Sequence, residues 1–220
     1  VLERNEKGFF LMVEGGKIDY ACHATDAATA VHEVNDMAES VQLALEFAAK
    51  HPKETLIIVT ADHETGGLTL GSGSYEMEPQ YLQYANISKD ELSRAFVKMR
   101  ESGEEVTWNQ VKAFLKEKLG FWDKIELTAA EENRLTQAYK EFFLDKRSKQ
   151  EANMYSVNES IAVVAVKILE SKAMVTWTFG SHSGAPVPVY ATGVKAEEFG
   201  KAKDNTDIPK IMMKVAKYKN

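Results

Sequence analysis

The chain has 220 residues, of which 44% are hydrophobic and 27% charged, a composition typical of a globular protein of one or two domains. Its formal net charge is −6 and its Lys and Arg residues are spread along the chain, which argues against a nucleic-acid partner. The longest apolar run, residues 161–166, is far short of the roughly 18 residues that a membrane span needs, and the single cysteine, Cys22, excludes an intrachain disulfide.

The first predicted element is a strand over residues 8–14. Its apolar run is bounded by glycines and ends in the carboxylate of Glu14, which favours a buried strand of a parallel sheet. A loop then leads to Asn35, a candidate cap for a helix over residues 36–50 whose apolar side chains fall on one face. A second buried strand is expected over residues 55–60. This order predicts a βαβ unit, in which ligands bind beyond the carboxyl ends of the strands.

A helical insertion is predicted between residues 72 and 172. Ser88 and Thr107 each begin an amphipathic stretch, and Thr128 with Glu131 fits the capping-box pattern. Ser156 with Glu159 fits the same pattern, ahead of an apolar stretch over residues 157–169 that should be a buried helix. We therefore expect three or four helices with no strand between them.

Strand character returns after the insertion, over residues 174–179 and 187–192, and Thr206 is a candidate cap for a last helix. The predicted fold is a three-layer α/β/α arrangement with a mostly parallel sheet and one helical insertion. Residues 1–71 and 173–220 would form the core of the fold, and residues 72–172 a crown or lid on it.

Metal-ligand types cluster at three places in this predicted core. Asp19 and His23 lie four residues apart, so one helical turn would present both on the same side. Asp62 and His63 follow a buried strand, and His182 lies in a glycine-flanked loop between two strands. Each place has an ordinary explanation of its own, such as a turn cap or a packed histidine. Together they suggest a zinc site, with Glu14 as an oxygen donor for a harder ion such as Mg²⁺.

The strings VEGGKID, VTADHETGG, GSHSGAPVPVYATG and DNTDIPKIMMKVA resemble the alkaline phosphatase family. They lie in the family's order and span nearly the whole chain apart from the helical insertion. The resemblance implies two zinc ions and one magnesium ion in the full-length protein. The ligands it implies are Asp19, His23 and His182 for the first zinc, Asp62 and His63 for the second, and Glu14 for the magnesium.

The family hydrolyses phosphate monoesters through a phosphoserine intermediate, with metal ions that clamp the entering and leaving oxygens. Its nucleophilic serine, a bridging aspartate, a phosphate-binding arginine and the first strand of its sheet have no counterpart that we find here. We therefore expect the C-terminal part of a phosphatase, inactive alone and able to hold at most about one zinc ion. The resemblance further implies a homodimeric parent protein in the periplasm or outside the cell.

Tyr20, Glu64 and Thr65 are predicted to support the ligands, Tyr20 beside the metals and the other two by orienting His63. Cys22 is interpreted as a packed small residue rather than a ligand. Two alternatives stay open. The parent protein could be another two-metal hydrolase, such as a sulfatase or phosphodiesterase, or the chain could be a non-catalytic metal-binding domain whose helices form a partner surface.

Overall fold

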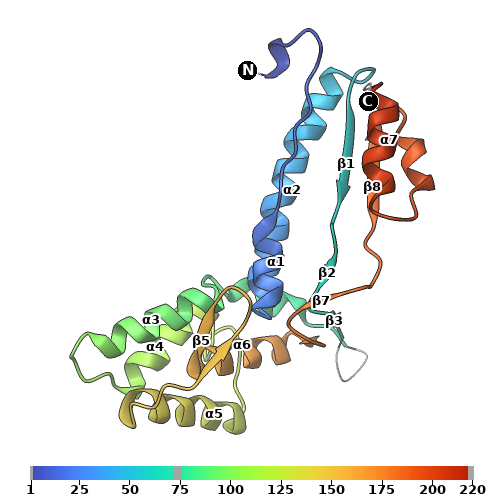
Figure 1. Ribbon diagram of the computed structural model, residues 1–220. Coiled ribbons are helices and arrows are strands. Elements are labelled where there is room, and N and C mark those ends of the chain that lie inside the picture. Colours follow the sequence, from blue (N-terminus) through green and yellow to red (C-terminus); the bar gives the residue numbers. More distant parts are fainter. Residues whose placement is uncertain (1, 72–75, 218–220) are drawn as a thin grey trace.

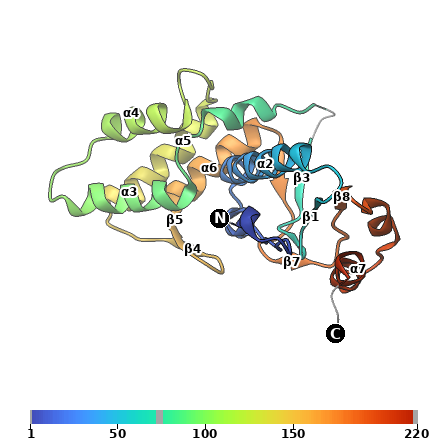
Figure 2. The same cartoon turned by 90° about the horizontal axis from the view of Figure 1, so that it is seen from above.

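The computed structural model describes residues 2–71 and 76–217. One part of the molecule is built on the long helix α2 (Ala27–Lys50), with α1 (Gly16–His23) packed against its first half (Figure 1). A second part, made of α3 to α6, lies to one side of the base of α2, and α7 (Asp207–Ala216) lies on the opposite side (Figure 2). The other helices are α3 (Lys89–Glu101), α4 (Trp108–Leu119), α5 (Ala129–Tyr139) and α6 (Ser160–Lys172), with short helical turns at Leu2–Arg4, Pro79–Tyr84, Lys140–Leu144 and Ala196–Lys201.

Every strand pair among the described residues is antiparallel and two-stranded, so the predicted mostly parallel sheet is not seen there. The ribbons are β1–β8, β2–β7, β3–β6 and β4–β5. Their strands are β1 (Leu56–Thr60), β2 (Glu64–Thr65), β3 (Leu68–Leu70), β4 (Gln150–Ala152), β5 (Val157–Glu159), β6 (Val175–Trp177), β7 (His182–Ser183) and β8 (Val189–Gly193). The hairpin β4–β5 also corrects the prediction that residues 72–172 hold no strand.

The apolar run at residues 8–14 is not a strand in this structure. It runs in extended form along α2 (Figure 1). The rings of Phe9 and Phe47 meet there edge to face, with centroids 5.7 Å apart. Its apolar side chains are exposed, Met12 by 73%. A buried parallel strand needs hydrogen-bonding neighbours on its edges, and no described residue pairs with this segment.

Two predicted helix starts are wrong: α2 is capped by a different side chain, and α6 begins without a side-chain cap. Helix α2 begins well before Asn35, since Asp26 accepts the backbone N–H of Thr29 at 3.1 Å and caps the helix there. Ser156 and Glu159 do not form a capping box: Ser156 donates to Asp90 at 2.8 Å, and Glu159 ends a strand. The capping box predicted at Thr128 is confirmed, and the helices predicted to begin at Ser88 and Thr107 are capped by those side chains. Thr206 precedes α7, but its side chain makes no capping hydrogen bond.

The apolar core lies mainly among α3 to α6. Phe96, Phe121 and Phe142 are among its fully buried side chains, and α6 is buried on most sides, as predicted. Ala27 and Ala28 join this core from the first turn of α2. The core therefore holds the base of α2 in place and fixes the direction in which α1 approaches it.

Buried polar contacts reinforce this junction. The backbone N–H of Ala27 and the indole N–H of Trp177 donate to Glu170 at 3.0 and 2.7 Å. The backbone N–H of Lys89 donates to Asp26 at 2.7 Å, and its ammonium group donates to the carbonyl and hydroxyl oxygens of Thr25 at 3.0 Å. The loop between α1 and α2 is thus tied to α3, α6 and β6.

No helix in residues 2–71 or 76–217 combines the length and the apolar character that crossing a membrane requires. The insertion predicted over residues 72–172 stays a prediction, and its first residues, 72–75, lie outside the described residues.

Burial raises the pKa of Glu170 from 4.5 to about 7, against the hydrogen bonds from Trp177 and Ala27. Between these values the folded protein keeps a proton that the unfolded chain releases, so stability falls as pH rises through this window. In the wild-type chain, the free energy of unfolding should fall by up to about 3 kcal/mol between pH 5 and 8 because of this proton. We expect Glu170→Gln, which keeps both hydrogen bonds but does not titrate, to abolish this fall.

The measurement is the free energy of unfolding in urea against pH, with the exposed Glu151→Gln as the matched control. If Glu170→Gln and the wild-type chain share one pH profile, the folded-state pKa of Glu170 is not raised and the prediction fails.

Candidate metal centre

Helix α1 carries Asp19 and His23 on one face, four residues apart, as the spacing predicts. Oδ1 of Asp19 lies 3.5 Å from Nε2 of His23. His23 is the last residue of the helix and is only 2% exposed, whereas the Asp19 side chain is partly open to solvent. The helix thus presents one buried imidazole and one accessible carboxylate to the same space.

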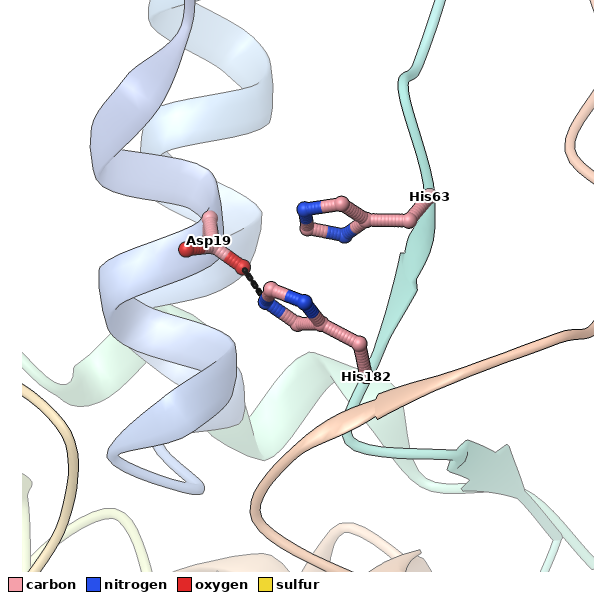
Figure 3. A group of neighbouring side chains, drawn as sticks. All are labelled: Asp19, His63 and His182. Atoms are coloured by element: carbon pink, nitrogen blue, oxygen red, sulfur yellow. Dashed lines mark ion pairs between the residues drawn. The ribbon is translucent and has the colours of Figure 1, made fainter. Parts of the chain in front are cut away.

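The short ribbon β2–β7 supplies the histidines that face this helix. Thr65 and His182 are direct partners in its register, and His63 lies just before β2. Nε2 of His182 is 3.4 Å from Oδ1 of Asp19, and the rings of His63 and His182 stack with centroids 3.5 Å apart. Figure 3 shows the carboxylate and the two rings pointing into one space, and one ligand atom from each lies within 4.8 Å of the others.

The position of the proton on His23 follows from its neighbours. Its Nδ1 lies 2.8 Å from the carbonyl oxygen of Gly180, which can only accept a hydrogen bond. Nδ1 therefore carries the hydrogen, and in the neutral ring Nε2 presents a lone pair. That lone pair faces Nε2 of His182 at 2.9 Å and Oδ1 of Asp19.

The three atoms have the spacing of ligands around one zinc ion. The separations among Oδ1 of Asp19 and the Nε2 atoms of His23 and His182 are 3.5, 3.4 and 2.9 Å. Zinc–ligand bonds of about 2.0–2.2 Å in a tetrahedron place the ligand atoms about 3.3–3.6 Å apart. The donor set, one carboxylate and two imidazoles, also matches catalytic zinc sites, which keep one position open.

Thr65 links this triad to His63. Its hydroxyl donates to Oδ1 of Asp19 at 2.6 Å, so its oxygen accepts from Nδ1 of His63 at 3.3 Å. Nε2 of His63 lies 3.3 Å from Oδ2 of the exposed Asp62. Asp62 and His63 thus form a second pair with ligand-like spacing beside the triad.

The charge state of the triad fits metal binding. Partial burial acts to raise the pKa of Asp19, but the hydrogen bond from Thr65 and the nearby His23 outweigh it and hold the pKa below its ordinary value. Burial, with Asp19 and Glu64 nearby, raises the pKa of Cys22 to about 11. Its thiol stays protonated at neutral pH, which supports its interpretation as a packing residue because thiolates, not thiols, bind metal.

Not every predicted site residue joins the cluster. Glu14 lies in the exposed extended segment, and Tyr20 contributes no ligand atom but stacks on Tyr155 at 3.9 Å. Glu64 accepts from the backbone of Gly67 at 2.6 Å and from the hydroxyl of Ser183, so it holds the β2–β7 ribbon rather than His63.

Sequence reasoning missed Tyr155, whose hydroxyl donates to Oδ2 of Asp19 at 3.1 Å. No motif or spacing could have found this residue, because it lies within the predicted insertion and reaches the site through the fold alone.

Known proteins match the chain over nearly its whole length. The alkaline phosphatase family model matches residues 1–218. Alkaline phosphatase 3 of Bacillus subtilis is 33% identical over 99% of this chain and 42% of its own length. The repressible alkaline phosphatase of Saccharomyces cerevisiae is 30% identical over 86% of this chain and 32% of its own. The chain therefore spans less than half the length of these curated relatives.

Solved structures agree on the fold. The cold-active alkaline phosphatase of a psychrophilic Shewanella species superposes with a TM-score of 0.78 and 28% identity, covering 98% of this chain and 47% of that one. The Thermus thermophilus alkaline phosphatase gives a TM-score of 0.66 at 24% identity, covering 97% of this chain and 44% of that one, and supports the fold alone. The family model, the relatives and the fold agree with the resemblance of the sequence motifs, and the chain belongs to the alkaline phosphatase family.

Proposed function

We propose that the protein carrying this chain hydrolyses phosphate monoesters and that Asp19, His23 and His182 hold its first zinc ion. The observation that carries the proposal is the triangle of their ligand atoms, whose 2.9–3.5 Å sides suit one tetrahedral ion. Family membership supports the phosphatase activity. We further propose Asp62 and His63 as ligands of a second zinc, and Glu14 as a ligand of magnesium.

The residues of the chain prepare this centre in distinct ways. Asp19 supplies negative charge, and the Thr65 hydroxyl fixes the carboxylate oxygen that faces the histidines. The Gly180 carbonyl accepts a hydrogen bond from Nδ1 of His23. This fixes the tautomer and the orientation of the ring, so that Nε2 is the nitrogen available to a metal ion. When bound, zinc would act as a Lewis acid on phosphoryl oxygens and lower the pKa of a bound water.

In the family, a serine attacks the phosphate ester and a phosphoserine forms. We find no counterpart of this nucleophilic serine in the 220-residue chain. We therefore propose that the 220-residue chain binds about one zinc ion without turnover. For the parent protein we propose homodimer formation and a periplasmic or extracellular location, both on family membership alone.

The first test is zinc binding by the purified chain. We expect a stoichiometry of about one, and His23→Ala or His182→Ala should weaken zinc affinity by more than the roughly 10- to 100-fold that loss of an outer partner costs. The measurement is titration against a chromophoric chelator. His51→Ala is the matched control, because the His51 ring lies beside Glu3, Glu54 and Phe47 at the far end of α2.

Equal zinc affinity in His182→Ala and His51→Ala would contradict the ligand assignment. A wild-type chain without measurable affinity would remove the metal centre altogether.

The second test concerns activity of the longer protein that contains this chain. We expect hydrolysis of p-nitrophenyl phosphate but not of p-nitrophenyl sulfate, loss of the activity with EDTA, and its recovery with Zn²⁺ and Mg²⁺. His182→Ala should lower kcat/KM by more than roughly 100-fold, because it removes a metal ligand. Sulfate-ester hydrolysis would point instead to a sulfatase, and turnover by the 220-residue chain alone would contradict the proposed absence of the nucleophile.

A further inference from the structure

Tyr155 stands out among the residues that the proposed function does not use. It lies in the turn of the β4–β5 hairpin, far from α1 in the sequence, yet its hydroxyl donates to Oδ2 of Asp19 at 3.1 Å. Among the described residues, this is the one hydrogen bond to that oxygen. The other carboxylate oxygen, Oδ1, faces both histidines and Thr65.

Ring contacts fix the direction from which this hydroxyl arrives. The Tyr155 ring stacks on the Tyr20 ring with centroids 3.9 Å apart and planes inclined by 27°. It also meets the His23 ring edge to face at 5.2 Å. Aromatic pairs of these geometries are favourable by about 0.5–1.5 kcal/mol beyond the area they bury. Helix α1 therefore carries both the receiving carboxylate and the platform that orients the tyrosine.

The turn that carries Tyr155 is itself held rigidly. The side-chain oxygen of Asn153 accepts the backbone N–H groups of Tyr155 and Ser156, each at 2.8 Å. Ser156 and Asn158 both donate to the Asp90 carboxylate in the first turn of α3, at 2.8 and 2.9 Å. A mobile loop could reach Asp19 only part of the time, whereas this turn is anchored to the helical part of the fold.

We propose that Tyr155 is a positioning residue of the metal centre: by holding Oδ2 of Asp19, it directs Oδ1 toward the zinc ion. The inference rests on the proposed zinc site and assigns a role to the hairpin of the predicted insertion. Carboxylates can bind a metal through one oxygen or both, and a hydrogen bond to one of them favours ligation through the other. Tyr155 touches no predicted reacting atom, so it acts through Asp19.

The test compares zinc affinity of the 220-residue chain with and without the hydroxyl. Tyr155→Phe keeps the stacked ring and should weaken zinc binding by roughly 10-fold or more, the scale of an outer hydrogen-bond partner. Tyr190→Phe is the matched control, because Tyr190 is 64% exposed and lies on β8, which pairs with β1 rather than with the ligand-bearing ribbon β2–β7. The melting temperature without metal should be the same in all three proteins, because both tyrosines are exposed.

A double-mutant cycle separates positioning from a general structural effect. In the Asp19→Ala background, we expect the histidines to retain weaker zinc binding. Tyr155→Phe should change this binding by less than about 2-fold, because the hydroxyl then has no carboxylate to hold and the effects of two interacting residues are not additive. The same loss in both backgrounds would overturn the role through Asp19.

The outcomes also separate this inference from the proposed function. If Tyr155→Phe does not change the zinc affinity, the positioning role is overturned but the proposed zinc site is not. A wild-type chain that binds no zinc would overturn both. Because affinity is measured without turnover, a failure of phosphatase activity in the longer protein would leave a measured effect of Tyr155→Phe intact.

Discussion

The candidate centre depends on the antiparallel pairing of β2 with β7. This ribbon places Thr65 directly opposite His182, and both then face Asp19 on α1. The ribbon is very short, and two-stranded ribbons have little stability of their own. Here Glu64 adds to the pairing, since its carboxylate binds the backbone of Gly67 and the hydroxyl of Ser183. Glu64, which was predicted to orient His63, thus stabilises the β2–β7 ribbon that positions both His63 and His182.

A second constraint sets where α1 stands. Asp26 caps α2 and also accepts from Lys89, while Glu170 receives the first N–H of α2 and the indole of Trp177. Unpaired buried polar groups are costly, so each member of this network is held to its partner. The α1–α2 turn is therefore tied to the helical core close to His23, the last residue of α1. These contacts also hold the His23 imidazole in position.

The sequence predicted best what depends on local spacing. The four-residue separation of Asp19 and His23, the capping box at Thr128 and the burial of α6 all follow from helical geometry. The predicted helix starts were wrong where more than one hydrogen-bonding arrangement is compatible with the sequence. Asp26 rather than Asn35 caps α2, and Ser156 donates to Asp90 rather than capping α6. The motifs indicated the family, but periodicity carries no information on which distant segment supplies a hydroxyl such as that of Tyr155. The predicted strand at residues 8–14 shows a further limit, since an apolar run becomes a strand only beside a strand with which it can pair.

The run of exposed apolar side chains at residues 8–14 ends just before α1, the helix that carries Asp19 and His23. The exposed run at residues 8–14 lies along α2, whereas the ligand-bearing elements α1, β2 and β7 contact one another directly. The contacts that align Asp19, His23 and His182 come from Thr65, Gly180 and Tyr155. None of these contacts runs through the exposed segment. A chain that spans less than half the length of its relatives can therefore hold three ligand atoms at the spacing of a tetrahedral ion, because the alignment is a property of α1, the β2–β7 ribbon and the β4–β5 hairpin.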